Sequence, residues 1–366
     1  MMIKVCFLLG GFQGNGGIGR VTSILVNRLC QDRDLEIHTI SYIQDDRPML
    51  YDINTEVHGH RLFTSPCSMM KAIVLHHAIR QVRTILRKEK IDLLIACGAL
   101  YYPLGILACR GSSAQCICWE HTNPASSADH RFQNLCRKFA EKRCAHMVVL
   151  TKSAEEYYKQ HYPACKDRLT QIYNPIAEGA SRSSRYHSES KKIISVGRLS
   201  YQKNFERLVS IAARILPQYP DWSWDIYGDG ELKNSLQALI DEHHLGAQLT
   251  LKGQVSDLYE RYGAYAFMVM TSRYEGFPMS LIEGAANRIP LISFDIPTGP
   301  NEIISDGVNG YLIEPNSDED MIDRIRSLIE APALRESMSN EAYQLTGAFT
   351  LERILEQWKT LYSKLV

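Results

Sequence analysis

Short apolar runs alternate with amphipathic stretches along the first half of the chain. The pattern predicts buried strands at residues 3–9, 35–41, 92–96, 116–119 and 147–150. Helical periods fall between these runs, for example at 21–29 and 71–87. Strand–helix alternation is typical of a parallel sheet covered by helices on both faces. We therefore expect a doubly wound, Rossmann-like α/β domain over residues 1–176.

A second alternation follows a small, polar stretch at 177–192, which is the best linker candidate. Strands are predicted at 193–196, 222–227, 248–251, 266–271, 291–294 and 310–313, with helices that include 205–216 and 232–243. We expect a second Rossmann-like domain over 193–348. The last segment, 349–366, carries an amphipathic helix at 351–365, which we expect to pack back across the domains. A length of 366 residues fits two such domains.

Composition narrows the class of protein. A hydrophobic fraction of 45% and a charged fraction of 22% are typical of a soluble globular protein. The 41 basic and 41 acidic side chains cancel, which argues against a nucleic-acid binder that depends on overall basicity. The balance is uneven along the chain, because residues 1–180 carry a net +6 and residues 181–366 a net −6.

All ten cysteines lie between Cys6 and Cys165, and no CxxC pair is present. Cys116 and Cys118 share one apolar run, which favours buried thiols over a zinc site. A thiol-rich chain without a disulfide framework predicts a cytoplasmic protein. The N-terminal apolar stretch is short for a signal peptide, and no apolar run approaches 18 residues.

The first glycine-rich loop, GNGGIG at 14–19, satisfies the GxGxxG pattern of dinucleotide-binding proteins. Its context fits poorly, because residues 10–13 separate it from the preceding strand and no acidic residue ends the second strand. The loop runs into a helix, whose first N–H groups favour phosphate. A glycine-rich turn without a ligand, and NAD binding, remain alternatives.

Two stretches of the second half combine charge with helix starts. VGRLSYQKN, at 196–204, places Arg198 and Lys203 on a strand–turn–helix, a suitable pair for a diphosphate, although a solvated loop has the same composition. EGFPMSLIE, at 275–283, places Glu275 before a helix and Glu283 between one and two turns along it. Two such carboxylates can accept hydrogen bonds from ligand hydroxyls, and the helix start attracts phosphate. A third stretch, 297–304, is interpreted as a structural cap.

These stretches together resemble the family 4 retaining glycosyltransferases. EGFPMSLIE resembles their E-x7-E motif, VGRLSYQKN their diphosphate-binding turn and SDGVNGYLIEP their closing strand. NGGIGRV resembles their N-terminal glycine loop, and IYNPI their crossing between domains. The resemblance implies the GT-B fold, in which two Rossmann-like domains face a central cleft. It also implies that no metal ion is required.

The resemblance assigns roles to matching residues. Arg198 and Lys203 would grip the donor diphosphate, and Glu283 would bind the ribose. Glu275 would contact the transferred sugar, with Gly276, Phe277, Met279 and Ser280 around the sugar and phosphates. Gly16 and Gly17 would close over the diphosphate, and Val255 lies in the segment that would hold the nucleobase.

His121 follows a predicted strand and matches the position of an active-site histidine in many members of this family. An imidazole there can hydrogen-bond the sugar or help the acceptor lose its proton. The histidine pairs 76–77 and 243–244 are interpreted as structural or solvated. No dedicated nucleophile is evident, so the resemblance favours front-face displacement with retained anomeric configuration.

Between Arg61 and Lys90 lie seven basic residues and one acidic residue. Met69, Met70, Ile73, Val74, Ala78, Val82 and Leu86 give this region a helical apolar stripe. A basic amphipathic helix can lie on an anionic leaflet, which would suit an enzyme with lipid-linked acceptors. The alternative is an ordinary helix packed on the sheet with its charges in water.

The sequence therefore predicts a cytoplasmic bacterial glycosyltransferase, with peripheral association on the inner face of the membrane as an open alternative. Its partners would be a UDP-sugar and a lipid-linked or polysaccharide acceptor, in capsule, lipopolysaccharide or lipid-linked oligosaccharide synthesis. No nucleic acid partner and no metal or other cofactor are expected. A GDP-mannose-dependent mannosyltransferase, a sugar-nucleotide epimerase of the same fold and a non-catalytic binding subunit are the alternatives.

Overall fold

The computed structural model describes residues 2–14, 16–67, 71–122, 125, 131–181 and 186–366. The chain divides into two compact units, residues 1–175 with 351–366, and residues 176–350. The stretch 177–192 falls in the second unit, although its residues 182–185 lie outside the described part of the chain.

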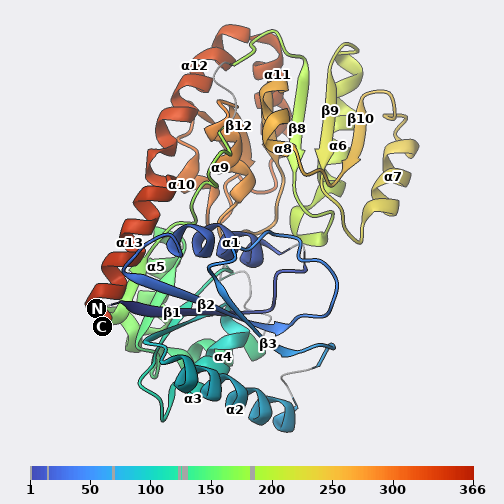
Figure 1. The fold of residues 1–366 in the computed structure, drawn as a ribbon. Coiled ribbons are helices and arrows are strands. Elements are labelled where there is room, and N and C mark those ends of the chain that lie inside the picture. The colour runs from blue at the N-terminus through green and yellow to red at the C-terminus, as the bar shows by residue number, and fades with distance from the viewer. Residues whose placement is uncertain (1, 15, 68–70, 123–124, 126–130, 182–185) are drawn as a thin grey trace. The chain divides into compact units, whose positions relative to one another are not determined.

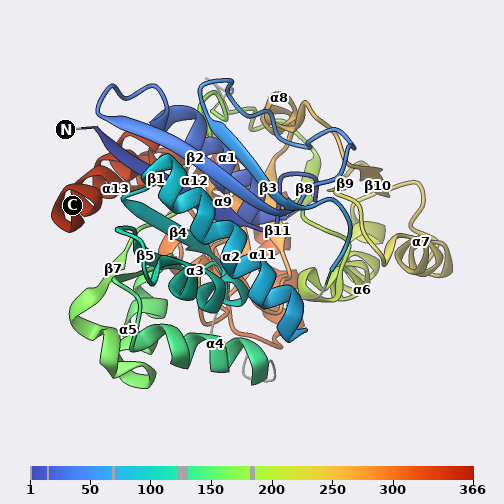
Figure 2. The same cartoon turned by 60° about the horizontal axis from the view of Figure 1, so that its bottom comes forward.

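The first unit is a parallel sheet in the order β3-β2-β1-β4-β5-β6-β7, of which Figure 1 labels β1, β2 and β3. Its strands are β1 (Ile3–Leu9), β2 (Leu35–Ile43), β3 (His58–Phe63), β4 (Leu93–Cys97), β5 (Gln115–Trp119), β6 (His146–Val149) and β7 (Leu169–Gln171). Its helices are α1 (Gly17–Leu29), α2 (Ala72–Glu89), α3 (Tyr102–Cys109), α4 (Arg131–Glu141), α5 (Lys152–His161) and α13 (Leu351–Leu365). Figure 2 shows α2 lying across one face of this sheet, with α3 beside it.

The second unit is a parallel sheet in the order β10-β9-β8-β11-β12-β13. Its strands are β8 (Lys192–Val196), β9 (Ser223–Tyr227), β10 (Leu249–Gly253), β11 (Phe267–Met270), β12 (Leu291–Phe294) and β13 (Gly310–Ile313). Its helices are α6 (Phe205–Ile215), α7 (Lys233–Glu242), α8 (Leu258–Arg261), α9 (Met279–Ala286), α10 (Pro300–Ile303), α11 (Asp318–Glu330) and α12 (Pro332–Gln344). The predicted α/β class with two doubly wound parallel sheets is confirmed.

The hydrophobic periods explain why these segments fold where they do. β4 and β6 are buried along their whole length, as expected of strands covered on both faces. α6 buries one stripe, which includes Leu208, Ala212 and Ile215, against the core of the second sheet. β3 and β7 were not predicted, because β3 buries only Leu62 and β7 is three residues long.

The last helix belongs to the first unit. Trp358 of α13 is fully buried, and its ring centroid lies 5.1 Å from that of Trp119 at the end of β5. Lys359 of the same helix pairs with Asp32. The chain therefore returns to its first sheet after the second unit is complete.

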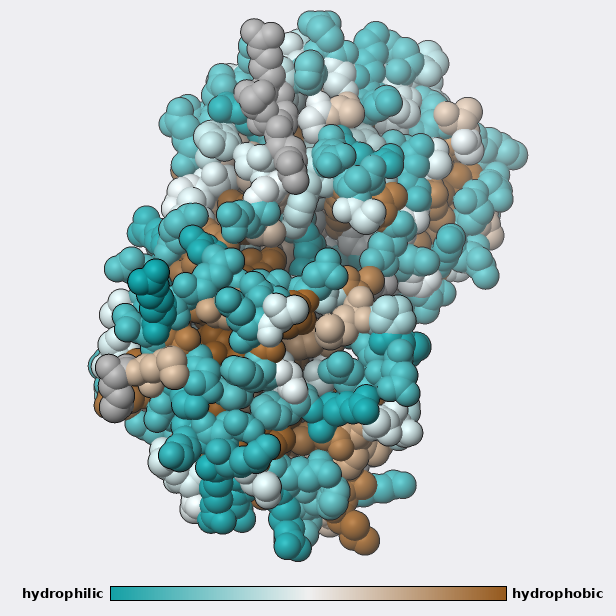
Figure 3. Space-filling view, in the orientation of Figure 1, coloured by the Kyte–Doolittle hydropathy of each residue, from teal (hydrophilic) through white to brown (hydrophobic). Residues whose placement is uncertain are grey.

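All ten cysteines are free, and only Cys30 and Cys67 are not fully buried, in accord with the prediction of small buried thiols. Among the described residues, no helix is both long and apolar enough to cross a membrane. The visible face in Figure 3 is mostly hydrophilic, with smaller apolar patches between the teal side chains.

Candidate functional site

The second sheet has a topological switch point between β8 and β11. Successive strands run outward from β8 in one direction through β9 and β10, and from β11 in the other through β12 and β13. Ligands of open α/β sheets bind outside the carboxyl ends of the strands at this point. The predicted donor residues 198 and 203 follow β8, and residues 275–283 follow β11. The fold therefore brings both predicted motifs to the edge where a ligand is expected.

The turn after β8 is held by close backbone packing. The N–H of Gly197 donates to the carbonyl of Tyr227, and the N–H of Leu199 donates to that of Asp229. Gly228 has φ +137°, and a Cβ there would lie 1.9 Å from the carbonyl oxygen of Gly197. Glycine is therefore required at residue 228, which sequence reasoning missed although the GDG triplet at 228–230 directly follows a strand.

Lys203 and Glu275 form an ion pair across the switch point. The Nζ atom of Lys203 lies 2.5 Å from Oε1 of Glu275, and their side chains are 17% and 7% exposed. Gln202 Nε2 donates to Oε2 of the same carboxylate at 3.3 Å and to the carbonyl of Tyr274. The structure thus joins the two predicted motifs through a half-buried cation and a buried carboxylate. Gln202 is a positioning residue that was not predicted.

Arg198, the other predicted cation, points into a more open setting. Its side chain is 61% exposed, and Nη2 lies 3.2 Å from a carboxylate oxygen of Glu231. An exposed pair of this kind contributes little to stability. The guanidinium can therefore leave Glu231 for an anionic ligand at small cost.

Glu283 is fully buried on α9, one turn and a fraction from the helix start, as predicted. Tyr259 donates its hydroxyl to Oε1 at 3.3 Å, and Tyr262 donates to Oε2 at 3.2 Å. These tyrosines were not predicted. A ribose hydroxyl would have to share or replace these hydrogen bonds.

The residues between the two glutamates form the start of α9. Phe277 and Ser280 are buried, while Gly276 and Met279 are half-buried. The hydroxyl of Thr298 donates to the carbonyl of Glu275, and a Cβ on Gly299, with φ +102°, would lie 2.4 Å from a ring atom of Pro278. The segment at 297–304, predicted as a structural cap, therefore contacts the EGFP turn at 275–278. Pro300 is the first residue of the short helix α10.

Val255, the predicted nucleobase residue, is half-buried and follows β10. Gly253 ends that strand with φ +70°, and its carbonyl accepts from the N–H of Gly228 at 2.9 Å. The β10 loop is thus tied to the β9 loop, which in turn packs on the turn that carries Arg198.

A cavity of about 960 Å³ lies on the side of the sheet covered by α6, α7 and α11. Among its lining residues are Asn204, Arg207, Ser272, Phe294 and Asp318. None of the predicted donor residues lines it. The volume of this cavity therefore does not identify it as the donor site. The general position of ligands in open α/β sheets favours the switch point instead.

The first glycine loop has room around its glycines. α1 begins at Gly17 with Gly16 as its N-cap, and a Cβ on Gly14, Gly16 or Gly17 would meet nothing within 4 Å. Gly11 is different, because its φ is +141° and a Cβ there would lie 2.5 Å from the carbonyl oxygen of Ile43. Asn15, the remaining residue of the turn, lies outside the described part of the chain. The fold requires Gly11 but leaves Gly16 and Gly17 open to solvent.

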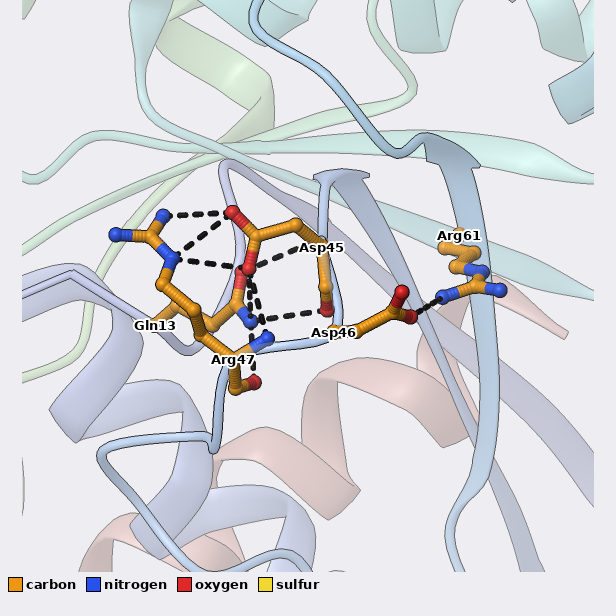
Figure 4. Close-up of polar contacts among 5 residues, drawn as sticks. All are labelled: Gln13, Asp45, Asp46, Arg47 and Arg61. Atoms are coloured by element: carbon orange, nitrogen blue, oxygen red, sulfur yellow. Dashed lines mark hydrogen bonds and ion pairs between the residues drawn. The ribbon is translucent and has the colours of Figure 1, made fainter.

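Gln13 clamps this loop to the segment after β2 (Figure 4). Its Nε2 donates to the carbonyls of Asp45 and Arg47, at 3.0 and 2.6 Å, and to Oδ1 of Asp45 at 2.9 Å. The N–H of Asp45 donates back to Oε1 of Gln13. Hydrogen bonds from the Arg47 side chain and backbone lower the pKa of Asp45 to about 2. Asp45 therefore remains an ionised partner of the clamp at neutral pH.

His121 lies just beyond β5 and packs against Trp119, with 4.1 Å between the ring centroids and an interplanar angle of 55°. Its Nε2 atom is buried and has no hydrogen-bond partner among the residues that the structure describes. Burial lowers the pKa of His121 to about 3, against a smaller raising effect of Glu120. The imidazole is thus neutral at physiological pH, and its proposed role is hydrogen bonding rather than charge. Asn123, two residues further along the chain, lies outside the described residues.

A buried network next to His121 was missed by sequence reasoning. Both oxygens of Glu120 are occupied: Oε2 accepts from Arg137 Nε and Tyr158, each at 2.7 Å, and Oε1 accepts from the Thr122 hydroxyl at 2.7 Å. Burial alone would raise the pKa of Glu120, but Arg137 and these hydrogen bonds outweigh it and lower the pKa. The network fixes the backbone at the end of β5.

The basic region at 61–90 contains α2, which packs on the sheet as the second of the two interpretations predicted. Ala78, Val82 and Leu86 are buried on the sheet, whereas Ile73 is 86% exposed and does not belong to the packed stripe. Met69 and Met70 lie outside the described residues. Arg83 donates to the carbonyls of Leu107 and Ala108, and Arg87 donates to that of Gly111. These two arginines therefore bind backbone carbonyls at and just after the end of α3. The other basic side chains of this stretch, Lys71, Arg80, Lys88 and Lys90, are exposed.

Comparison with known proteins matches each half of the chain to a glycosyltransferase family. The model of glycosyltransferase family 4 matches residues 15–178, and that of glycosyl transferases group 1 matches residues 178–345. The amylovoran biosynthesis glycosyltransferase AmsD of Erwinia amylovora is 29% identical over a 366-residue alignment that covers 98% of this chain and 99% of the relative.

Solved structures show the same fold at low identity. TarM of Staphylococcus aureus, in complex with UDP and other ligands, gives a TM-score of 0.82 at 16% identity, over 99% of this chain and all of TarM. HepE of Anabaena, in complex with UDP, gives 0.79 at 14% identity over the whole of both chains. With one family model on each half of the chain and two parallel-sheet units, this protein belongs to the glycosyltransferases of the GT-B fold.

Proposed function

We propose that this chain is a retaining glycosyltransferase that moves a hexose or N-acetylhexosamine from a UDP-sugar to a lipid-linked or polysaccharide acceptor of the bacterial surface. The observation that carries the proposal is the Lys203–Glu275 pair at the switch point of the second unit. An ammonium suits a diphosphate, and a carboxylate suits sugar hydroxyls. The Lys203–Glu275 ion pair thus positions the residue proposed for the diphosphate and the residue proposed for the sugar.

The proposed transfer requires stabilisation of UDP as the leaving group. The bond between the anomeric carbon and the diphosphate oxygen breaks, and UDP leaves with the electron pair. The acceptor hydroxyl oxygen bonds to the same carbon, and its proton passes to the departing diphosphate oxygen. Lys203, Arg198 and the first N–H groups of α9 would meet the charge that develops on the diphosphate. Glu275, released from Lys203 by the phosphates, would accept hydrogen bonds from the transferred sugar. These cations would take the place of a metal ion.

Glu283 would hold the ribose of the donor, with Tyr259 and Tyr262 as outer partners of its carboxylate. His121 would act as a neutral hydrogen-bonding group toward the sugar or the acceptor. Gly16 and Gly17 present an open helix start, which suits the close approach of a phosphate. Each of these roles is part of the proposal.

The choice of UDP over GDP is supported by the two solved neighbours, both of which hold UDP. The surface-glycan role is supported by AmsD, which is named for amylovoran biosynthesis. Retention of configuration is supported by the resemblance of EGFPMSLIE to the E-x7-E motif.

The test measures UDP release from UDP-glucose, UDP-galactose, UDP-N-acetylglucosamine and UDP-N-acetylgalactosamine, with GDP-mannose beside them. Slow hydrolysis without an acceptor is expected for one UDP-sugar. Glu275→Gln should lower it at least about a hundredfold, since it removes a transition-state contact. Glu242→Gln, an exposed residue on α7, is the matched control. Turnover of GDP-mannose alone would contradict the proposed donor, and normal turnover by Glu275→Gln would contradict the proposed site.

We further propose that the exposed cations of α2 approach an anionic leaflet. Lys71, Arg80 and Lys88 are exposed, whereas Arg83 and Arg87 are engaged with backbone carbonyls. Replacing all three exposed residues by Glu should therefore reduce binding to vesicles of phosphatidylglycerol without unfolding the protein. Equal partitioning of this variant and the wild type would contradict membrane contact through α2.

A further inference from the structure

A second group of reactive side chains lies on the edge of the first sheet, away from the predicted donor residues. Glu36 and His38 are two residues apart on β2, so they share one face of the sheet. His58 and His60 stand likewise on β3, and His38 is the direct cross-strand partner of His58. The imidazole centroids of His38 and His58 lie 4.7 Å apart. Two parallel strands thus place three histidines and a glutamate side by side.

The spacing of these groups suits a transition-metal ion. One ligand atom each from Glu36, His38 and His58 lie within 4.8 Å of one another. Neighbouring ligands of a tetrahedral zinc ion, bound at about 2.0–2.2 Å, lie about 3.3 Å apart, so small side-chain rotations close the site. A ligand set of imidazoles with one carboxylate binds zinc in preference to magnesium or calcium, which favour oxygen ligands alone.

Hydrogen bonds within the group orient His38 as a ligand. Its Nε2 lies 2.8 Å from Oε1 of Glu36, and its Nδ1 lies 3.3 Å from Nε2 of His60. A cation can replace the proton between Nε2 and the carboxylate. His38 would then donate its Nδ1–H to His60, the outer partner that metal-bound histidines usually have.

The surrounding charges leave the group able to bind a cation. Lys4 lies 2.7 Å from Oε1 of Glu36, where it can remain as an outer partner of the carboxylate. Lys88 and Glu89, at the end of α2, face His60 with opposite charges.

We propose that Glu36, His38 and His58 form a tetrahedral zinc-binding site that a water molecule completes, with His60 as the outer partner of His38. The site lies at the amino ends of β2 and β3, whereas the glycine loop and His121 follow carboxyl ends of strands in the same sheet. Its role is structural: zinc joins the edge strand β3, which buries only Leu62, to β2. This site is independent of the proposed transfer reaction.

The test uses tag-free, chelator-treated full-length protein titrated with zinc chloride by calorimetry. One zinc per chain is expected, with no heat from magnesium chloride. His58→Gln should weaken zinc binding at least tenfold, because even the loss of an outer partner costs that much in known sites. The His58 side chain is exposed, so this variant should keep the metal-free melting temperature of the wild type. His76→Gln, an exposed histidine on α2, is the matched control.

A second measurement does not depend on the stability of any variant. Cobalt bound to the wild-type protein should give the visible absorption of a tetrahedral site, and equimolar zinc should abolish it. Absence of zinc binding, unchanged affinity in His58→Gln, equal loss in His76→Gln or octahedral cobalt absorption would each overturn the proposal.

Discussion

At the scale of single residues, we expect the buried ion pair of Glu120 and Arg137 to matter most for the stability of the fold. Their side chains are 1% and 0% exposed, and they meet at 2.7 Å beside His121. Removing one partner leaves a buried charge uncompensated, which costs about 3–5 kcal/mol. We expect Arg137→Met to lower the free energy of unfolding by that amount, as measured by urea denaturation.

Two further variants make this measurement specific. Lys159→Met breaks an exposed helical pair with Glu155 and Glu156, and it should change stability by no more than about 0.5 kcal/mol. The double variant Glu120→Gln/Arg137→Met should cost less than the sum of its single changes, because neither charge is then left alone. A wild-type stability for Arg137→Met would contradict the assigned network.

The residues that carry charge at strand ends could be predicted, whereas their partners could not. Lys203 and Glu275 stand next to recognisable turns, so sequence alone selected both. Glu120 and Arg137 are 17 residues apart on a strand end and a helix, and nothing local links them. Gln202, Tyr259 and Tyr262 were missed for the same reason, since their contacts exist only after folding.

At the scale of elements, a substitution at the start of α1 is expected to change the unfolding free energy and the UDP affinity in opposite directions. Gly17 is the first helical residue, and a Cβ there would meet nothing within 4 Å. Alanine favours helix by up to about 1 kcal/mol over glycine. We therefore expect Gly17→Ala to raise the unfolding free energy slightly while lowering UDP affinity, since the methyl group would stand where a phosphate approaches.

Thermal melts and calorimetry on the same samples check both halves of this expectation. Gly246→Ala, at another open glycine in the second unit, should leave UDP affinity unchanged. Gly11→Ala should instead destabilise the fold, because residue 11 needs φ +141° and lies against the carbonyl of Ile43. A Gly17→Ala protein with wild-type UDP affinity would remove the glycine loop from the site.

Strand prediction failed where burial is small. The apolar runs gave β1, β12 and β13 their observed bounds, because buried parallel strands read as continuous hydrophobic segments. The segment HGHRLF lacks such a run, so β3 was not predicted, and neither was the histidine cluster that β3 forms with β2. Only the cross-strand register brings His38 and His58 together.

At the scale of the whole molecule, acid should destabilise the first unit. Burial lowers the pKa of His121 to about 3 and that of His146 to about 4, and it also lowers the pKa of His38 and His60. In the unfolded chain these groups titrate near pH 6.5. Their neutral burial therefore stabilises the fold fully above about pH 6.5, and this contribution is lost as the pH falls toward 4.

Hydrogen exchange at pH 7 and pH 5 measures this effect by segment. Protection of the β6 peptide, which contains His146, should fall at pH 5 after correction for the intrinsic exchange rate. His146→Gln, which cannot take up the proton, should show a smaller fall. Equal pH dependence in both proteins would contradict the assignment of acid sensitivity to His146.

The two-unit organisation was predictable because each unit repeats the strand–helix pattern, and the GT-B resemblance ordered the motifs. The position of the last helix was only partly predictable. Its amphipathic pattern gave the bounds of α13, but the burial of Trp358 against Trp119 depends on chain segments more than two hundred residues apart. Long-range packing of that kind has no local signature.

The central claim is a sugar-nucleotide site at the switch point of the second unit, and calorimetric titration with UDP, GDP and NAD tests it most directly. We predict that UDP binds preferentially, that Lys203→Ala weakens it at least tenfold, and that exposed Lys233→Ala does not. Saturating UDP at 100 times its Kd should also stabilise the fold by about 2.7 kcal/mol. Binding of NAD without UDP or GDP, or UDP affinity unaffected by Lys203→Ala, would contradict the claim.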